Sequence, residues 1–401
     1  MGFDDLIKIA ESAFKKKFKE ADKPFIYAKD EKPVNGLVLD CPLLEYLFDR
    51  RYIPYGRFYL CYGKKGSSKT SFFYDLAKIV QAQQGDVAWM ETERAADLVY
   101  AAKQGVDLSK LSLSHPESLE QALTLGEELV RGMPKAYPEG NTPVLVCLDS
   151  IAGSVTEYEQ ESKHSILDAS IGQHARILSR WYREMQNPLA NEKCIFLCLN
   201  QLKASIGGMP MFGEEPPEAM IGGFAPGFHS TYQLKFDRTR DLVAEDEYGA
   251  ERKVGARIKI TCKRNKLGRD GNKQFIIGDL YEHGGYDWWG PLVRKLKEEY
   301  TPLVGDGGSG WYLWKTGGMT YKEPASGEEI PIDTEQKFRE SELGFIIKNS
   351  VPAKELIRKA FGIPDMPAQE ILDQVEAERK VKRKKKKKEE EEGGEKAKAV
   401  L

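Results

Sequence analysis

A nine-residue segment combines glycines, hydroxyl side chains and lysines at a spacing suited to binding phosphate. It follows the apolar run RFYLCY, precedes a helical pattern, and consists of Gly63, Lys64, Lys65, Gly66, Ser67, Ser68, Lys69, Thr70 and Ser71. The backbone N–H groups of such a turn, together with the N-terminus of the next helix, attract phosphate oxygens. In the pattern G-x-x-x-x-G-K-[ST] the lysine neutralises the terminal phosphates and the hydroxyl ligates Mg²⁺. Lys69 and Thr70 are therefore predicted to hold the phosphates and the metal of a nucleotide.

Ser68 departs from this pattern, because glycine is usual at that position. A positive φ angle there costs serine on the order of 1 kcal/mol. The alternative is a strand-to-helix turn rich in glycine and serine that binds no phosphate.

Acidic residues at the ends of two predicted strands extend the candidate site. Asp149 ends VLVCLD, a position suited to holding Mg²⁺ through water, although an acid there also serves as a helix cap. Glu91 and Glu93 follow the strand DVAWM, and a carboxylate there can deprotonate an attacking water. The residues alone do not choose between Glu91 and Glu93.

The elements that must position these residues are apolar runs of strand length, which alternate along the chain with helical patterns. Strands are predicted at 57–63, 86–91, 144–150 and 194–201, and helices at 69–84, 117–132 and 169–187. Buried strands alternating with helices predict an α/β fold with a mostly parallel central sheet. The later runs YQLKFDR and ARIKITCKRNK alternate polar with apolar residues and predict an antiparallel extension of that sheet.

Four regions are predicted along the chain. Residues 1–35 form an N-terminal oligomerisation segment with an amphipathic helix at 3–19, and residues 36–290 form the core. A small α+β C-terminal domain at 291–378 contains a glycine-rich break at 305–310. Residues 379–401 are a run of lysines and glutamates that cannot bury a core and are predicted to be disordered.

The composition excludes several classes of protein. With 60 Lys+Arg against 62 Asp+Glu the chain is not a uniformly basic nucleic-acid binder, although local basic surfaces remain possible. It contains no apolar run of about 18–20 residues, so no membrane-spanning helix is predicted. Three of its six cysteines lie inside apolar runs, which favours a reducing, cytoplasmic compartment. The five histidines show no zinc-binding spacing.

The order and spacing of these motifs resemble those of the RecA family of DNA recombinases. WMETERAADLVYAAKQGVDL is similar to the family's strand, catalytic glutamate and base-contacting helix. The resemblance implies that Glu93 is the general base and that Tyr100 stacks on adenine with Asp97 nearby. Within the family, GGYDWWGPLV, GWYLWK and LIRKAFGI resemble the T4-type phage recombinases (UvsX kind), which also replace the glycine before the loop lysine. The resemblance covers about residues 36–375, so residues 36–290 are expected to be a RecA-like ATPase core.

The resemblance implies two loops that bind single-stranded DNA. The first is about 158–167 and offers Lys163 and His164, although a solvated loop before a helix explains it equally well. The second is about 202–221, a long segment without periodicity, which is usually functional or disordered. Its expected DNA contacts are Lys203 to phosphate, Met209, Met211 and Phe212 to bases, and the di-glycine Gly222 and Gly223 to the backbone. The alternative is a lid or partner loop without DNA.

Three further residues take a role from the resemblance. Gln201 is expected to sense the γ-phosphate and to pass that state to the second loop, although it also fits an ordinary strand-end cap. Arg264 and Lys266 of KRNK are expected to reach the γ-phosphate of the neighbouring subunit, and Lys263 is an alternative for one of them. A charged run can equally be a solvated face. A nucleotide between subunits implies a head-to-tail contact, which generates rings or open helices.

The resemblance thus implies an ATP-dependent recombination protein that uses ATP and Mg²⁺. Its expected partners are single-stranded and double-stranded DNA, further copies of itself in a helical filament, and single-strand-binding and mediator proteins, with no membrane. Its expected compartment is the cytoplasm, that of the host if a phage encodes it. Two alternatives remain open: a hexameric DNA helicase with the same core, and a DNA-coating or mediator protein that does not hydrolyse ATP, which Ser68 supports.

Overall fold

A computed structural model describes residues 3–17, 35–161, 172–204, 218–268, 274–317 and 319–364. Residues 36–364 form one compact unit. The helix α1 (Phe3–Lys17) belongs to a different unit, and its apolar Leu6 and Ile9 are 56% and 52% exposed. The predicted N-terminal helix is therefore confirmed. No helix in the described ranges is long and apolar enough to cross a membrane.

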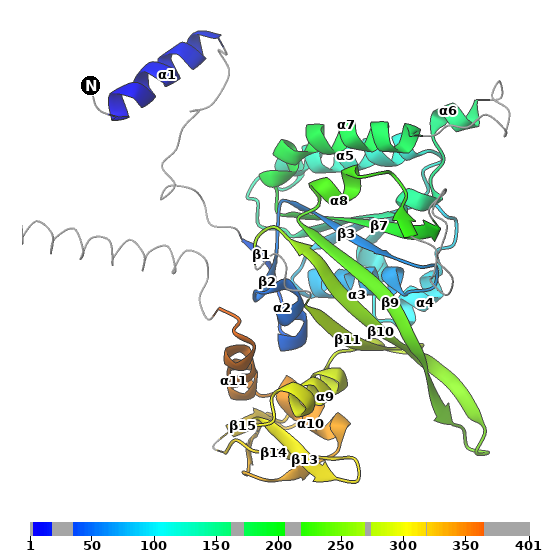
Figure 1. The fold of residues 1–401 in the computed structure, drawn as a ribbon, viewed down its shortest axis with the longest axis vertical. Coiled ribbons are helices and arrows are strands. Elements are labelled where there is room, and N and C mark those ends of the chain that lie inside the picture. The colour runs from blue at the N-terminus through cyan, green and yellow to red at the C-terminus, as the bar shows by residue number, and fades with distance from the viewer. Residues whose placement is uncertain are drawn as a thin grey trace, which may run out of the picture. The chain divides into compact units, whose positions relative to one another are not determined.

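A single large sheet forms the centre of the compact unit (Figure 1). Its parallel part includes, in this order, β3 (Arg57–Gly63), β7 (Cys194–Ala204), β6 (Val144–Asp149), β4 (Asp86–Glu91) and β5 (Leu111–Ser114). This mostly parallel α/β architecture confirms the predicted fold class. The strands predicted at 57–63, 86–91, 144–150 and 194–201 all form within this parallel part.

Helices cover both faces of the sheet. On one face Phe72 and Phe73 of α3 (Lys69–Ala82) pack with Tyr59 and Cys61 of β3. On the other face α5 (Leu119–Ala136) and α7 (Gln173–Ala190) pack with Phe58 and Leu60 of the same strand. Successive side chains of a strand point to opposite faces, so the continuous apolar run RFYLCY fits a strand that is buried on both sides.

The second half of the sheet departs from the predicted antiparallel extension. The strand β9 (Tyr232–Glu245) is parallel to β3 but antiparallel to β10 (Glu251–Asn265), and β11 (Phe275–Tyr281) and β12 (Gly285–Asp287) continue this antiparallel part. The prediction was therefore right for the pairing of β9 with β10 and wrong for the pairing of β9 with β3. The chain leaves β7 at its carboxyl end and, after α8 (Ala225–His229), enters β9 at the amino-terminal end of the parallel strands; such a crossover produces a parallel strand. Beyond the sheet, β9 and β10 continue as a two-stranded ribbon (Figure 1).

The glycine-rich segment at 305–310 is not a break between regions. It forms the hairpin between β13 (Val304–Gly308) and β14 (Trp311–Trp314), where Gly308 and Gly310 have φ angles of 78° and 77°. Glycine is favoured in this turn because L-residues rarely adopt such angles. The remaining elements of this region are α9 (Trp289–Glu299), β15 (Met319–Lys322), β16 (Glu329–Ile332), β17 (Lys337–Phe338), α10 (Glu340–Lys348) and α11 (Val351–Phe361).

Buried ion pairs connect α11 to the start of the compact unit. There, β1 (Gly36–Val38) and β2 (Tyr52–Pro54) flank α2 (Pro42–Phe48). Arg358 of α11 donates two hydrogen bonds, of 2.7 and 2.6 Å, to the carboxylate of the fully buried Glu45 of α2. Because separating such a buried pair leaves an uncompensated charge, these bonds fix α11 against α2. The boundary proposed at residue 290 therefore lies inside a region that packs as one unit and stays a prediction.

Candidate functional site

The amine of Lys69 lies inside a ring of oxygen atoms from its own loop. Its Nζ donates hydrogen bonds to the carbonyl oxygens of Gly63 (3.3 Å) and Lys64 (3.1 Å) and to the hydroxyl of Ser67 (3.3 Å). The residue is only 9% exposed, and burial lowers the pKa of Lys69 although nearby Asp149 and Glu93 act to raise it. A buried cation at the N-terminus of α3 is suited to receiving an anion such as phosphate.

Two positions of the loop are constrained, Gly63 by the space around it and Ser68 by its backbone conformation. A Cβ on Gly63 would lie 2.3 Å from the carbonyl oxygen of Phe236, so only glycine fits there. Ser68 has φ 66° and ψ 32°, a left-handed conformation that favours glycine, and its side chain makes no cap hydrogen bond to α3. The free-energy cost of this backbone conformation is therefore not offset by a hydrogen bond between the serine hydroxyl and the N-terminus of the helix, which a capping hydroxyl normally makes.

Thr70, in the first turn of α3, meets Asp149 at the carboxyl end of β6. The hydroxyl of Thr70 donates to Oδ2 of Asp149 at 2.9 Å. Burial, with smaller contributions from Glu93 and Glu91, raises the pKa of Asp149 to about 6, although Thr70 and Lys69 lower it. Nearby groups only weakly compensate the negative charge of this buried carboxylate, and a hydroxyl oxygen lies beside it. This arrangement suits a hard divalent cation.

Mg²⁺ usually takes one or two protein ligands, while phosphate oxygens and water complete its shell. Thr70 and Asp149 together supply that number of ligands. Within the described ranges no group of three or more His, Cys, Asp or Glu side chains is arranged to hold a metal without such help.

The two glutamates after β4 have different surroundings. Glu91 is buried, and its Oε1 accepts from the backbone N–H groups of Glu93 (2.8 Å) and Ala95 (3.2 Å), while its Oε2 lies 3.2 Å from Nδ1 of His115. Glu91 therefore shapes the backbone turn. Glu93 is exposed, and its Oε1 accepts from the hydroxyl of Ser150 (2.6 Å). The geometry favours Glu93 as the carboxylate that can approach a bound water.

The end of β7 joins this carboxylate to the predicted second loop. Gln201 donates from Nε2 to Oε1 of Glu93 at 2.7 Å, and the preceding Asn200 donates from Nδ2 to the carbonyl oxygen of Ile221 at 2.8 Å. Residues 202–204 pair with β8 (Glu218–Met220), so the two ends of the segment between them are tied together. Lys203 lies exposed on this ribbon.

The di-glycine after β8 has a packing reason in addition to its predicted one. Gly222 and Gly223 have φ angles of 89° and 66°, and a Cβ on Gly222 would lie 2.5 Å from the side chain of Leu178. Both positions therefore favour glycine whatever they bind.

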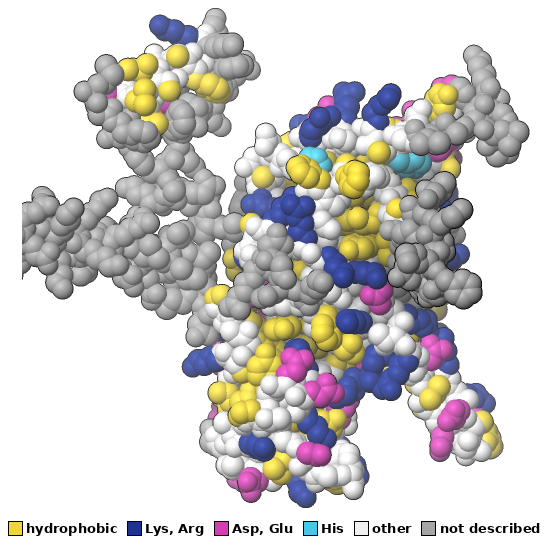
Figure 2. All heavy atoms as spheres, viewed as in Figure 1, with side chains coloured by type: hydrophobic (Ala, Val, Ile, Leu, Met, Phe, Trp, Pro, Cys, Tyr) yellow, Lys and Arg dark blue, Asp and Glu magenta, His cyan; other side chains and the backbone are white. Residues whose placement is uncertain are grey.

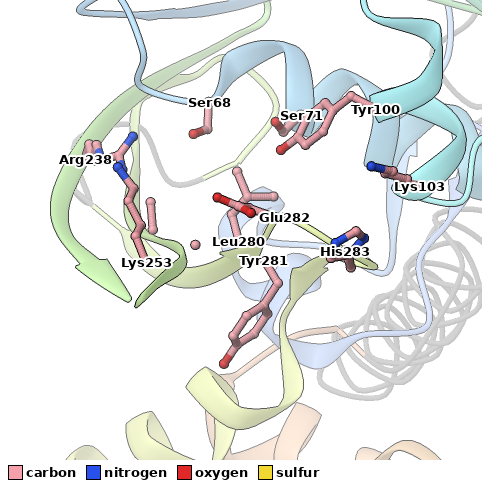
Figure 3. A pocket seen from close by; sticks show the side chains of 12 residues that line it. Ser68, Ser71, Tyr100, Lys103, Arg238, Lys253, Leu280, Tyr281, Glu282 and His283 are labelled. Atoms are coloured by element: carbon pink, nitrogen blue, oxygen red, sulfur yellow. The ribbon is translucent and has the colours of Figure 1, made fainter. Parts of the chain in front are cut away.

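A pocket of about 410 Å³ opens beside the loop (Figure 3). Ser68, Ser71 and Tyr100 line one side, and Arg238 and Lys253 face them from β9 and β10. Asp97 does not line it; its carboxylate caps α4 (Leu98–Lys103) by accepting from the N–H of Tyr100 at 2.8 Å. The sequence missed Lys103, which lies on α4 with Tyr100. It also missed the lining residues that sheet topology brings from far along the chain, namely Arg238, Lys253, Gly255, Ala256, Leu280, Tyr281, Glu282 and His283.

Arg264 and Lys266 lie away from the lysine of the loop. Asn265 between them pairs with Tyr232, which is in register with Tyr59, four residues before Gly63 on β3. At about 3.3 Å per residue this separation is about 13 Å along the strand. Both side chains contact α8 instead: Arg264 donates to the carbonyl oxygen of Gly227 (3.5 Å) and Lys266 to that of Phe228 (2.5 Å). Burial and Arg264 lower the pKa of Lys266.

The surface around α8 combines apolar and basic side chains. Phe224 and Phe228 are 94% and 64% exposed, and Figure 2 shows hydrophobic side chains at the surface over α8 with basic side chains close by. Lys263, the alternative to Arg264 or Lys266, is also exposed and sits at a β-bulge between Cys262 and Arg264.

Part of the predicted DNA-binding set lies outside the described residues: Lys163, His164, Met209, Met211 and Phe212. Of the first predicted loop the structure describes the start, which is the short helix α6 (Glu157–Gln160) with a capping box between Thr156 and Glu159. The structure therefore corrects the beginning of that loop to a helical turn.

Taken together, these features define an α/β protein in which a central strand leads through a glycine-containing loop into a helix, with acids at the neighbouring strand ends. The family model for the RecA N-terminal domain matches residues 11–284. Protein RecA of Listeria welshimeri serovar 6b is 33% identical over 264 residues, which are 65% of this chain and 68% of that protein. Protein RecA of Listeria ivanovii and of Listeria monocytogenes serotype 4a are each 34% identical over the same shares. The chain belongs to the RecA family.

Proposed function

We propose that the chain is an ATP-dependent strand-exchange protein that forms helical filaments on single-stranded DNA and pairs that DNA with a homologous duplex. The observation that carries this proposal is the pair of adjacent hydrogen bonds at the end of β7. Gln201 contacts Glu93 beside the Lys69 loop, and Asn200 contacts the chain that follows the predicted DNA loop. A nucleotide bound at the loop and DNA bound at residues 202–221 would therefore both affect the hydrogen bonds of Gln201 and Asn200.

At the nucleotide, each residue has a distinct task. Lys69 leaves its loop oxygens to neutralise phosphate charge, and the loop N–H groups bind phosphate oxygens. Thr70 and Asp149 hold Mg²⁺, which when bound supplies further neutralisation of phosphate charge. Glu93 accepts the proton of the attacking water. Tyr100 and the pocket beside it accommodate the adenosine portion of ATP.

Coupling between nucleotide and DNA follows from the shared partner of Gln201. An amide that donates either to Glu93 or to a phosphate oxygen has two discrete arrangements, and each places the start of the DNA loop differently. Gly222, Gly223 and Lys203 are described at the base of this loop and are proposed to contact the DNA backbone. Lys163, His164, Met209, Met211 and Phe212 are proposed to complete the contacts with DNA.

The separation of Arg264 and Lys266 from Lys69 supports catalysis between subunits. Within one chain these cations lie about 13 Å along the strand from the loop, so we propose that they act on the nucleotide of the next protomer. A positive charge supplied from outside stabilises the negative charge that develops during phosphoryl transfer. Such a head-to-tail contact generates a helix when it does not close into a ring.

The narrower assignments rest on the sequence. We propose a T4-type phage recombinase of the UvsX kind, because Ser68 and the motif GGYDWWGPLV are shared with that group. This narrower assignment also implies that the protein lies in the cytoplasm of an infected host. Its proposed partners there are single-strand-binding and mediator proteins. Residues 1–35 are proposed for oligomerisation, 36–290 for the ATPase core, 291–378 as a C-terminal domain and 379–401 as a charged tail.

Mixing two inactive variants tests this proposal. Glu93→Gln lacks the proton acceptor but keeps Arg264, whereas Arg264→Ala lacks the external cation but keeps Glu93. We expect the unmodified chain to release phosphate from ATP faster with single-stranded DNA than without it, and each variant alone to be nearly inactive. An equal mixture should recover about a quarter of the unmodified rate, because about one interface in four then combines both intact residues.

The same measurement on the mixture can contradict the proposal. A mixture no more active than its separate components would place Arg264 outside the neighbour's site. Absence of any stimulation by DNA in the unmodified chain would instead favour a DNA-coating protein that does not hydrolyse ATP.

A further inference from the structure

The hydroxyl of Tyr286 contacts the backbone of the loop residue that departs from the usual pattern. Tyr286 lies on β12 and donates a hydrogen bond of 3.2 Å to the carbonyl oxygen of Ser68, which is 218 positions earlier in the chain. The tyrosine is buried, with 7% of its surface exposed. It therefore contacts the peptide directly before Lys69, the residue proposed to bind phosphate.

Ser68 needs support from elsewhere because its own side chain provides none. Its φ angle of 66° is one that a residue with a Cβ rarely adopts, and its hydroxyl makes no cap hydrogen bond to α3. Its carbonyl oxygen already accepts the first helical bond from the N–H of Phe72 at 3.2 Å. The bond from Tyr286 is a second restraint on the same oxygen, and it comes from outside the helix.

Tyr286 is itself held in place. Its ring stacks on Trp288 with centroids 4.5 Å apart and planes 9° from parallel, and it meets Phe72 edge-on at 6.4 Å. Trp288 in turn donates from Nε1 to Asp75 of α3 at 2.7 Å. Burial raises the pKa of Tyr286 well above its ordinary value, so its hydroxyl keeps the proton that it donates. Tyr286 of β12 and the nearby Trp288 thus contact α3 at its N-cap, Ser68, and again about two turns later at Asp75.

We propose that Tyr286 is a positioning residue that keeps the serine-containing loop in its phosphate-binding conformation, in place of the glycine that is usual at position 68. The inference rests on the proposed binding of nucleotide at this loop. It predicts that the contribution of the Tyr286 hydroxyl depends on which residue occupies position 68. With glycine there, the left-handed conformation needs no external restraint.

The test is a double-mutant cycle in the full-length chain, with a fluorescent ATP analogue and Mg²⁺ as the probe. Tyr286→Phe removes the hydroxyl and keeps the ring stack; we expect about fivefold weaker binding, the usual worth of one such hydrogen bond. In the background of Ser68→Gly, the same Tyr286→Phe change should alter affinity by less than about twofold. In hydrolysis, Tyr286→Phe should raise KM and leave kcat close to that of the unmodified chain, because the residue acts on loop geometry.

Tyr232→Phe is the matched control. It removes another buried tyrosine hydroxyl that donates to a backbone carbonyl oxygen, that of Phe48 at 3.1 Å, away from the loop. It should lower thermal stability about as much as Tyr286→Phe and leave affinity for the analogue unchanged.

Three results would overturn the inference. The first is that Tyr286→Phe binds the analogue as tightly as the unmodified chain. The second is that it loses as much affinity with glycine at position 68 as with serine, and the third is that it matches Tyr232→Phe in every readout. Failure of the unmodified chain to bind the analogue is a separate outcome, which overturns the proposed function and this inference with it.

Discussion

Replacing Lys69 by alanine is expected to abolish nucleotide binding. The variant loses the only loop cation that is buried among the backbone oxygens where phosphate is proposed to bind. A hydrogen bond to a charged group contributes about 1.5–3 kcal/mol, so losing two of them weakens affinity by a factor of about a hundred or more. Titration with a fluorescent ATP analogue and Mg²⁺ measures this loss directly.

Lys65→Ala is the comparison variant for this experiment. Lys65 belongs to the same loop but is exposed to solvent, where a single charge contributes little, so its loss should weaken binding by less than about fivefold. Equal losses in the two variants would mean that general positive charge, and not the enclosed amine of Lys69, attracts the ligand. The unfolding temperature of both variants should be measured, to show that the loop change has not unfolded the chain.

Replacing Glu93 by glutamine is expected to block turnover while nucleotide and DNA still bind. The amide keeps the shape of the side chain and an oxygen that can accept from Gln201 and Ser150, but it cannot take a proton from water. Loss of a general base lowers kcat by a factor of about 10²–10⁴. Phosphate release and binding of labelled single-stranded DNA, measured on the same preparation, separate the two effects.

The opposite outcome is expected for the same substitution two residues earlier, Glu91→Gln. Its Oε1 accepts two backbone N–H bonds and its Oε2 faces His115, so the change should lower the unfolding temperature and reduce turnover far less. If Glu91→Gln stopped turnover and Glu93→Gln did not, the assignment of the general base would be reversed.

Local pattern was enough to predict the parallel half of the fold and the centre of the site. The run RFYLCY, the loop and the amphipathic helix after it are contiguous, so spacing alone places Lys69 and Thr70 beside a strand end. Asp149 was predictable because carboxyl ends of parallel strands share one edge of a sheet. The positive φ angle of Ser68 also followed from its place in the motif.

Features that depend on long-range topology were not predictable. The parallel direction of β9 follows from the crossover through α8, and the alternation of its residues carries no information about that direction. Likewise, the pocket receives Arg238 and Lys253 only because β9 lies beside β3, and β10 beside β9, in the folded sheet. The different surroundings of Glu91 and Glu93 arise from hydrogen bonds that two acids in one loop do not reveal by their spacing.

The bond between Gln201 and Glu93 gives the proposed function its mechanism. If the amide exchanges this carboxylate for a phosphate oxygen, the segment that begins at Lys203 must respond, because Asn200 holds the other end of it through Ile221. Nucleotide state and DNA affinity are then linked by a coupling free energy that acts in both directions.

The most direct test of this coupling is the affinity of the full-length chain for a labelled single-stranded oligonucleotide, measured by fluorescence anisotropy at one fixed salt concentration. We predict at least about tenfold tighter binding with saturating non-hydrolysable ATP analogue and Mg²⁺ than without nucleotide, within the usual range of coupling between sites. Identical dissociation constants in the two conditions would contradict the account.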